Sequence, residues 1–463
     1  MEQHYDRDYY LEYHEELDKR LEQFVQHLAT GRQALLGQHN IKEPLQTFLF
    51  YRLTLERDHY NQCRLQGMSV DASLKRVNSF LSTFEKDGQK TEVRQEEVLS
   101  SVKDHPWNEQ LTEYQGMPLV YIFNDRQLTY LTPLLQKLDC PLLLLSEYDI
   151  PEDTDLPESV LALTIDFSSE RIFANKMFER TFPLIFHYTN TFDILLQILQ
   201  PCGVVCLEGC HVQEQLLAVI AESYGIPSYG IQQGWPSMMR TGFRRLPFRY
   251  FFTWGERFSD LWSRYNPHPR FIPAGYMYQV TDGLAGIQNC VSFFLQAPCY
   301  LSDRNYFNSL IALVSIAAQS FPNVVFLVRE HPEYKLEKSI IENWRGMTNV
   351  EIVSDSRLQD VYVRSKVVVS HFSSSLMEGM LYGAIPLVFD PTTHSRYYPD
   401  VEKEGIGRIA ASPTEFLSCL KELLEGQLQP LQSTALKHWF AATGDGTLRS
   451  ITNFLKDTCR KDK

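Results

Sequence analysis

VVVSHFSSSLMEGMLYGAIPLVFD, residues 367–390, is the stretch that decides the fold. Three valines begin an apolar run that stops at a polar group of one histidine and three serines. A helical pattern follows, and Gly383 and Pro386 precede a second apolar run. Two short apolar runs joined by a helix are typical of a βαβ unit, whose strands are parallel and buried on both faces.

The same alternation extends in both directions from this stretch. It predicts two doubly wound α/β domains in tandem, residues 106–285 and 286–463, separated by a polar, Gly-containing break at 281–289. A helix at 447–459 is expected to close the second domain. Strands are predicted at 117–123, 140–146, 182–188, 203–209, 226–234, 249–255, 270–275, 290–296, 323–333, 350–355, 366–372 and 385–390.

Residues 1–105 follow a different pattern and are predicted to form an N-terminal helical subdomain. Leu17, Leu21, Phe24 and Leu28 recur at helical spacing, with charged residues between them. The pattern favours a subdomain packed on the rest of the chain. An oligomer contact or a membrane-surface element is the alternative.

Composition excludes several classes of protein. The chain has 463 residues and a formal net charge of −13, whereas a general nucleic-acid binder is usually basic. Nine cysteines in such a length do not indicate a disulfide framework. Cys202, Cys206 and Cys210 are spaced by four, but a strand entering a turn does not bring three such sulfurs together, so no metal site is expected. No signal-like leader or apolar stretch of about 20 residues is present, which favours a cytoplasmic protein.

The polar residues that follow the strands are the candidates for a site, because doubly wound sheets bind ligands beyond the carboxyl ends of their strands. Ser373, Ser374 and Ser375 open a helix whose free N–H groups can hold a phosphate. Glu378, one turn later, can accept two ribose hydroxyls. The alternatives are an ordinary N-cap and a solvated glutamate near a helix start. Together these residues favour nucleotide binding.

Two further strand ends carry candidates. Arg329, His331 and Pro332 follow the apolar strand at 323–328, where the histidine can reach a phosphate or leaving group; the alternative is a turn with a surface histidine. Glu208 ends the strand VVCL, where it is either a general base or a cap of the next helix.

A basic segment follows the strand that ends near Gln233. Arg240, Arg244 and Arg245 lie within a few residues of one another in an acidic chain, so with Gln233 they are predicted to bind an anionic acceptor or a lipid headgroup. A solvated basic loop is the alternative. No P-loop, HExxH motif or Gly-rich dinucleotide fingerprint occurs, so no cofactor is expected.

At these residues the sequence resembles glycosyltransferases of the GT-B architecture, which have two Rossmann-like domains. More narrowly, it is similar to the capsule Kdo transferases and polysialyltransferases of bacterial surface-polysaccharide assembly, and more distantly to CDP-glycerol polymerases. Their acidic-acidic-Gly, HP and serine motifs correspond here to Leu207-Glu208-Gly209, His331-Pro332 and Ser373-Ser374-Ser375. The resemblance implies that Glu208 is catalytic and that His331 and the serines hold the donor phosphate.

The resemblance therefore implies a metal-independent glycosyltransferase. Its donor would be a nucleotide-sugar, with CMP-Kdo or a CMP-sialic acid favoured and a UDP-sugar as the alternative. Its acceptor would be a glycan or a lipid-linked glycan, with peripheral contact at the inner membrane left open.

Three other functions remain open. These are a UDP-GlcNAc 2-epimerase-like enzyme, a CDP-glycerol-type phosphotransferase, and a non-catalytic protein that binds a nucleotide-sugar. Leu207 in the first acidic position, and Gln233 where many relatives have histidine, favour the last.

Overall fold

The computed structural model describes residues 7–31, 39–54, 67–90, 111–165, 181–235, 241–280, 289–297, 304–332, 334–391 and 400–461. The chain divides into two compact units. The first-sheet unit comprises Tyr13–Gln233, Arg240–Tyr278 and Phe440–Lys463. The second-sheet unit comprises Met1–Glu12, Gly234–Met239 and Gln279–Trp439.

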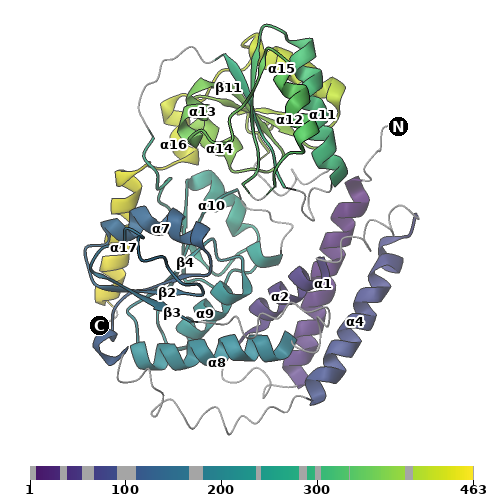
Figure 1. The fold of residues 1–463 in the computed structure, drawn as a ribbon. Coiled ribbons are helices and arrows are strands. Elements are labelled where there is room, and N and C mark those ends of the chain that lie inside the picture. The colour runs from purple at the N-terminus through teal and green to yellow at the C-terminus, as the bar shows by residue number, and fades with distance from the viewer. Residues whose placement is uncertain are drawn as a thin grey trace. The chain divides into compact units, whose positions relative to one another are not determined.

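The first-sheet unit contains seven parallel strands in the order β3-β2-β1-β4-β5-β6-β7. Helices cover the sheet on both faces, as Figure 1 shows. The strands are β1 (Leu119–Ile122), β2 (Leu142–Ser146), β3 (Val160–Thr164), β4 (Val204–Leu207), β5 (Ser228–Ile231), β6 (Tyr250–Thr253) and β7 (Arg270–Pro273). The helices are α7 (Asp125–Lys137), α8 (Thr181–Leu199), α9 (Val212–Ser223), α10 (Glu256–Ser263) and α17 (Asp445–Lys461).

The second-sheet unit repeats this order with six parallel strands, β10-β9-β8-β11-β12-β13. The strands are β8 (Cys290–Phe294), β9 (Val325–Arg329), β10 (Val350–Ile352), β11 (Ser365–Ser370), β12 (Ile385–Phe389) and β13 (Arg408–Ala410). The helices are α11 (Arg304–Ser320), α12 (Lys338–Arg345), α13 (Leu358–Arg364), α14 (Ser375–Met380), α15 (Pro413–Leu424) and α16 (Ser433–Trp439).

The apolar runs become strands because both faces of each sheet are covered. Every residue of β1, β4, β8 and β12 is buried. A polar side chain at such a position would have to give up its water without a partner, so central strands of parallel sheets accept mostly apolar residues.

The N-terminal helices are α1 (Arg7–Gly31), α2 (Lys42–Thr54) and α4 (Val70–Lys90). Leu17, Leu21 and Val25 of α1 are buried, and α2 packs on α9 and on the segment Thr241–Phe243. Arg20 of α1 binds Asp71 of α4, and the two long helices lie side by side in Figure 1. The described helices therefore pack on the first-sheet unit, as the sequence favoured.

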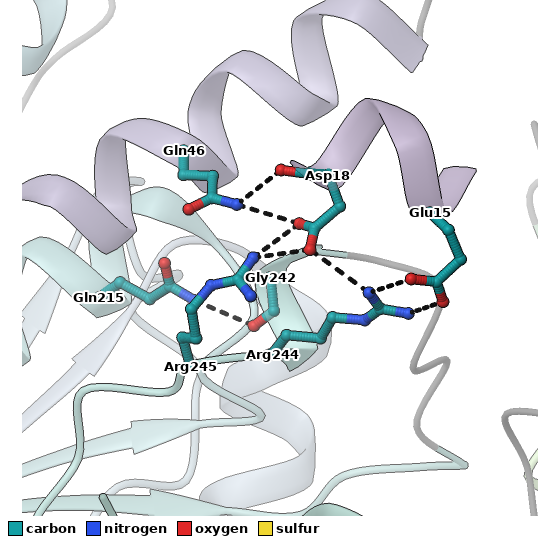
Figure 2. Close-up of polar contacts among 7 residues, drawn as sticks. All are labelled: Glu15, Asp18, Gln46, Gln215, Gly242, Arg244 and Arg245. Carbon is teal, nitrogen blue, oxygen red and sulfur yellow. Dashed lines mark hydrogen bonds and ion pairs between the residues drawn. The ribbon is translucent and has the colours of Figure 1, made fainter. Parts of the chain in front are cut away.

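A partly buried ionic network connects α1 to the segment that follows β5. Arg244 contacts Glu15 at 2.8 Å and Asp18 at 3.3 Å, while Arg245 Nη2 donates to both carboxylate oxygens of Asp18 at 2.7 and 2.8 Å. The side-chain amide of Gln46, on α2, donates to Asp18 at 3.0 Å. Figure 2 shows that Gln46, Arg244 and Arg245 converge on Asp18 from α2 and from the segment that follows β5.

Two elements differ from the sequence-based expectation. Residues 182–188 were expected to form a strand but are the first part of helix α8. The expectation was wrong because the apolar residues of this segment and of residues 191–199 together follow one helical spacing. The buried residues described in α8 recur at helical spacing: Ile185, Tyr188, Thr189, Phe192, Leu195, Leu196, Ile198 and Leu199. The short edge strands β3 and β13 were not predicted, since β3 is partly exposed and carries only a weak apolar run.

The C-terminal helix also differs from expectation. Residues 440–463 were assigned to the second domain, but they belong to the first-sheet unit. Leu448, Ile451 and Leu455 of α17 are part of the core built on β1, β4 and β5, and Thr458 hydrogen-bonds the hydroxyl of Tyr229. Burial of this apolar face, rather than closeness in sequence, decides where the helix packs. In the described residues no helix has the length and apolar content to cross a bilayer.

We expect Asp18→Ala to lower the free energy of unfolding by about 3 kcal/mol, because it leaves two guanidinium groups facing each other without their shared carboxylate. Arg244 and Asp18 each have a side chain only 7% exposed, so water cannot replace the lost partner. Urea unfolding measures the change. Glu425→Ala, which removes an exposed pair with Lys421, is the control and should cost less than about 0.5 kcal/mol. Equal costs for the two variants would contradict this account.

His14 makes the stability of this region depend on pH. Burial, and next the neighbouring Arg244, lower its pKa to about 3 from the ordinary 6.5. The unfolded chain therefore takes up the proton first, so the stability present above pH 6.5 is lost as the pH falls. From pH 6.5 to 5 we expect a loss of about 2 kcal/mol. Unfolding curves at both pH values should show a smaller loss in His14→Leu, and an unchanged loss would refute the assignment.

Candidate functional site

Strand order places a binding edge in each unit. The connections leave β1 and β4 in opposite directions, and the same reversal occurs between β8 and β11. In doubly wound sheets the opening beyond the carboxyl ends of two such strands is where ligands bind. The residues directly after β4 and β11 therefore define two candidate loci, one in each unit.

The locus in the second-sheet unit is the loop between β11 and α14. The Ser370 hydroxyl donates to the carbonyl of Phe294 at 2.7 Å, and the Phe372 amide donates to the Gln296 side chain at 2.9 Å. Both acceptors follow or end β8, so the loop is held across the point where the strand order reverses.

The three serines lie together at the start of α14, as the sequence predicted. The Ser373 hydroxyl donates to Ser375 Oγ at 3.1 Å, and Ser374 Oγ accepts from the amide of Trp235 at 3.0 Å. The structure finds no side-chain cap at Ser374, the residue before the helix. The Ser375 amide donates to Ser373 Oγ at 3.3 Å, so Ser373 does cap the start of the helix locally. The phosphate role of the three serines stays a prediction.

Glu378 lies in the first turn of α14 and is half-buried. The hydroxyl of Tyr362 donates to its carboxylate at 3.0 Å. Tyr362 is fully buried and stacks on Phe294 and Tyr382. Burial, and next the charge of Glu378, raise the pKa of Tyr362 well above its usual range, so the phenol remains a donor and fixes the carboxylate.

Sequence reasoning missed a buried pair behind this loop. His371 Nε2 lies 2.9 Å from Asp390 Oδ1, and each side chain is 1% exposed. The rings of Tyr306 and Phe372 pack on His371. Asp390 directly follows β12, so the rule that marked the other strand ends would also have marked it. The pair ties the ends of two adjacent strands together.

Arg329, His331 and Pro332, at and after the end of β9, were expected to contact a phosphate, and in the structure some of their groups are engaged in bonds within the fold. Arg329 donates through Nη1 to the carbonyls of Val353 and Ser356, so that nitrogen serves the loop after β10 rather than a ligand. His331 is half-buried in a turn in which its carbonyl accepts from the Tyr334 amide at 3.1 Å. Pro332 is exposed. His331 and Pro332 thus stay candidates, and the phosphate role of Arg329, of which only Nη1 is engaged in these bonds, stays a prediction.

The locus in the first-sheet unit is the turn Glu208-Gly209-Cys210-His211, directly after β4. Glu208 and Gly209 both have left-handed backbones, with φ of 62° and 71°. Such a conformation is rare for a glutamate and bends the chain sharply. The Cys210 thiol lies 3.6 Å from Glu208 Oε2.

Two buried carboxyl groups lie behind this turn and were not predicted. Glu214 accepts from Gln127 Nε2 at 3.0 Å and from the His211 amide at 3.2 Å. Glu147 accepts from the hydroxyls of Tyr121 and Tyr188. Burial raises the pKa of Glu214 well above its usual range, and the charges of Glu208 and Glu147 add to this effect. Glu147 directly follows β2, so the strand-end rule would have marked it, whereas Glu214 lies inside α9 and its position in sequence gave no signal.

The expected acceptor site is corrected by the structure. Arg244 and Arg245 are neutralised by the carboxylates of α1, so they stabilise the fold and do not form a free basic surface. Arg240 lies outside the described residues. Gln233 is half-buried after β5, and the Gln232 side chain accepts from the Trp254 amide at 2.8 Å.

The spaced cysteines do not share one site. Cys202 Sγ lies 2.7 Å from Cys459 Sγ, on α17, whereas Cys206 is buried within β4 and Cys210 contacts Glu208. The expectation that these three sulfurs do not converge is therefore confirmed.

Comparison with known proteins supports this description of the fold. A family model for CDP-Glycerol:Poly(glycerophosphate) glycerophosphotransferase matches residues 282–448, which contain the whole second sheet. A search of curated protein sequences finds no match.

Solved structures match more of the chain. The UDP-GlcNAc 2-epimerase of Methanocaldococcus jannaschii, crystallised with UDP-GlcNAc and UDP, is similar at a TM-score of 0.50 with 11% identity, covering 73% of this chain and 100% of the epimerase. A glycotransferase of kitacinnamycin matches at 0.49 with 13% identity, over 74% and 99% of the two chains. A lipopolysaccharide outer core galactosyltransferase matches at 0.46 with 10% identity, over 73% and 100%.

Such low identities bear on the fold alone. The expected α/β fold, with two Rossmann-like sheets of the GT-B kind, is confirmed.

The turn at Gly209 can be tested by adding a methyl group. A Cβ at this position would lie 2.3 Å from the Phe248 ring, in addition to the strain of the left-handed backbone. We expect Gly209→Ala to destabilise by about 3 kcal/mol. Gly225→Ala, with φ of 75° and no atom within 4 Å, isolates the backbone strain and should cost about 1 kcal/mol. Denaturant unfolding measures both, and similar costs would show that the Phe248 contact is unimportant.

Proposed function

We propose that the protein is a glycosyltransferase that moves a sugar from a nucleotide-sugar, with a CMP-sugar such as Kdo or sialic acid favoured over a UDP-sugar. The acceptor is a surface glycan or glycolipid. One observation carries the proposal: three serine hydroxyls and a half-buried, fixed carboxylate lie together beyond the carboxyl ends of β8 and β11.

In this proposal each group has a separate task. The hydroxyls of Ser373, Ser374 and Ser375 hold the donor phosphate. Glu378 accepts the two ribose hydroxyls, and its bond from Tyr362 keeps its second oxygen in place. His331, at the neighbouring strand end, donates to the phosphate that leaves. These donors stabilise the charge that develops on the departing phosphate, so donor binding requires no metal.

The first-sheet unit supplies the acceptor side. Glu208 is the one half-buried carboxylate in the turn after β4, and it either deprotonates the acceptor hydroxyl or stabilises the reacting centre. The proposal includes peripheral contact with the cytoplasmic membrane, because a lipid-linked acceptor is held there. Arg244 and Arg245, two of the basic residues expected for this contact, are paired with carboxylates of α1, so the acceptor is recognised by groups other than these two.

The family model favours a second candidate function. A glycerophosphotransferase would use CDP-glycerol and extend a glycerol-phosphate polymer. The match covers the second sheet, where the donor nucleotide is proposed to bind. Both candidates therefore share a cytidine nucleotide at the same residues and differ in the group that is transferred.

A thermal-shift screen of CMP, CDP, UDP and GDP tests the donor site. At a ligand concentration of 100 times Kd, stabilisation should be about 2.7 kcal/mol. We expect the cytidine nucleotides to give the largest shift, and Ser373→Ala and Glu378→Gln to lower the affinity at least tenfold. Ser320→Ala and Glu402→Gln, on exposed positions of the same unit, are matched controls. No shift with any nucleotide would refute the proposal.

Product analysis then separates the functions. Transfer to an acceptor from a CMP-sugar supports the first candidate, and transfer from CDP-glycerol supports the second. Turnover of UDP-GlcNAc without an acceptor would indicate an epimerase. Nucleotide binding without turnover, unchanged in Glu208→Ala, would indicate a binding protein. A transferase should lose turnover in Glu208→Ala while keeping its nucleotide affinity.

A further inference from the structure

The turn after β4 gathers three different metal-binding groups. One ligand atom each from Glu208, Cys210 and His211 lies within 4.8 Å of the other two. Cys210 Sγ and Glu208 Oε2 are 3.6 Å apart. Ligand atoms about 2.0–2.3 Å from a tetrahedral ion lie roughly 3–4 Å from one another, so small rotations of the side chains would complete the geometry.

The backbone of this turn is fixed on both sides. The Glu208 amide donates to the Ile231 carbonyl on β5 at 2.6 Å, and buried Gln215 donates through Nε2 to the carbonyls of Gly209 and Gly242. His211 immediately precedes α9, and its ring packs edge-on against Phe123 at 4.7 Å. The three groups are thus positioned by the strand, the helix and a buried amide before any ligand arrives.

Electrostatics around the turn favour a cation. Glu214 and Glu147 are buried close to it, and the Glu214 carboxylate accepts from the His211 amide at 3.2 Å. A bound divalent ion would offset the repulsion among these carboxyl groups.

We propose that Glu208, Cys210 and His211 bind a zinc ion, with the fourth coordination position open. A set of thiolate, imidazole and carboxylate suits Zn²⁺, whereas Mg²⁺ and Ca²⁺ prefer oxygen ligands alone. Three protein ligands and one open position are typical of zinc sites that bind water or a hydroxyl group. The site lies where the first sheet's strand order reverses, which is the expected ligand edge.

This inference departs from the sequence, which predicted no metal, and it does not rest on the proposed sugar transfer. The spacing in the sequence drew attention to Cys202, Cys206 and Cys210, whereas the structure brings Cys210 together with Glu208 and His211. Binding releases the Cys210 thiol proton to the solvent and requires a neutral His211 ring. Affinity should therefore fall as the pH is lowered.

The test uses the full, untagged chain after removal of metals by a chelator. Isothermal titration with Zn²⁺ should give one ion per chain. Titration with Co²⁺ should produce the near-ultraviolet charge-transfer absorption of a cobalt–thiolate bond. Cys210→Ser should abolish that absorption, and His211→Gln and Glu208→Gln should each weaken Zn²⁺ binding at least tenfold.

Cys140→Ser, a half-buried cysteine of the same unit, is the matched control and should keep both signals. Far-ultraviolet circular dichroism verifies that each variant is folded. If Cys210→Ser is unfolded, the variants at the half-buried residues His211 and Glu208 still test the site. Absence of stoichiometric Zn²⁺ binding, or a thiolate absorption that persists in Cys210→Ser, would overturn the proposal. Neither result depends on nucleotide binding in the second-sheet unit.

Discussion

Parallel strand pairing around a central reversal of order is the constraint on which the other features depend. Each sheet begins with a central strand, builds outward to one edge, and then returns to the centre to build the other half. The two halves diverge between β1 and β4, and between β8 and β11. Helices cannot fill the space beyond the carboxyl ends of these strands, so the chain's polar turns lie there. Glu208 and Ser373 owe their positions to this geometry.

Much of the fold could be predicted because buried parallel strands require apolar runs. Residues 119–122 and 385–389 are uninterrupted apolar segments, residues 290–294 are apolar except for Ser292, and each segment is a strand. The strand predicted at residues 182–188 was wrong for the same reason, because a short apolar run alone does not distinguish a strand from a buried helix. The helical spacing of the following residues was the better guide. The edge strand β13 has three residues and offers too little pattern to detect.

The candidate site was predictable where its residues directly follow strands, and unpredictable where tertiary contacts decide. Ser373, Ser375 and Glu378 lie together as expected, because one turn of helix brings them together locally. Arg244 and Arg245 looked like a surface for anions, but their partners are on α1, more than 200 residues away in the chain. Nothing near an arginine in sequence reveals a carboxylate that distant. The same applies to Tyr362, which fixes Glu378 through a fold-dependent contact.

Helix α17 has a consequence for how the protein is made. Its apolar face, with Leu448, Ile451 and Leu455, completes a core whose first strand is residues 119–122. A ribosome synthesises the chain from its N-terminus, so the strands of the first sheet, residues 119–273, emerge well before helix α17, residues 445–461, which packs on them. The second sheet, encoded entirely in between, has all of its strands available earlier. The second sheet can thus mature first, while the first sheet keeps an apolar face uncovered until residues 445–461 have been made.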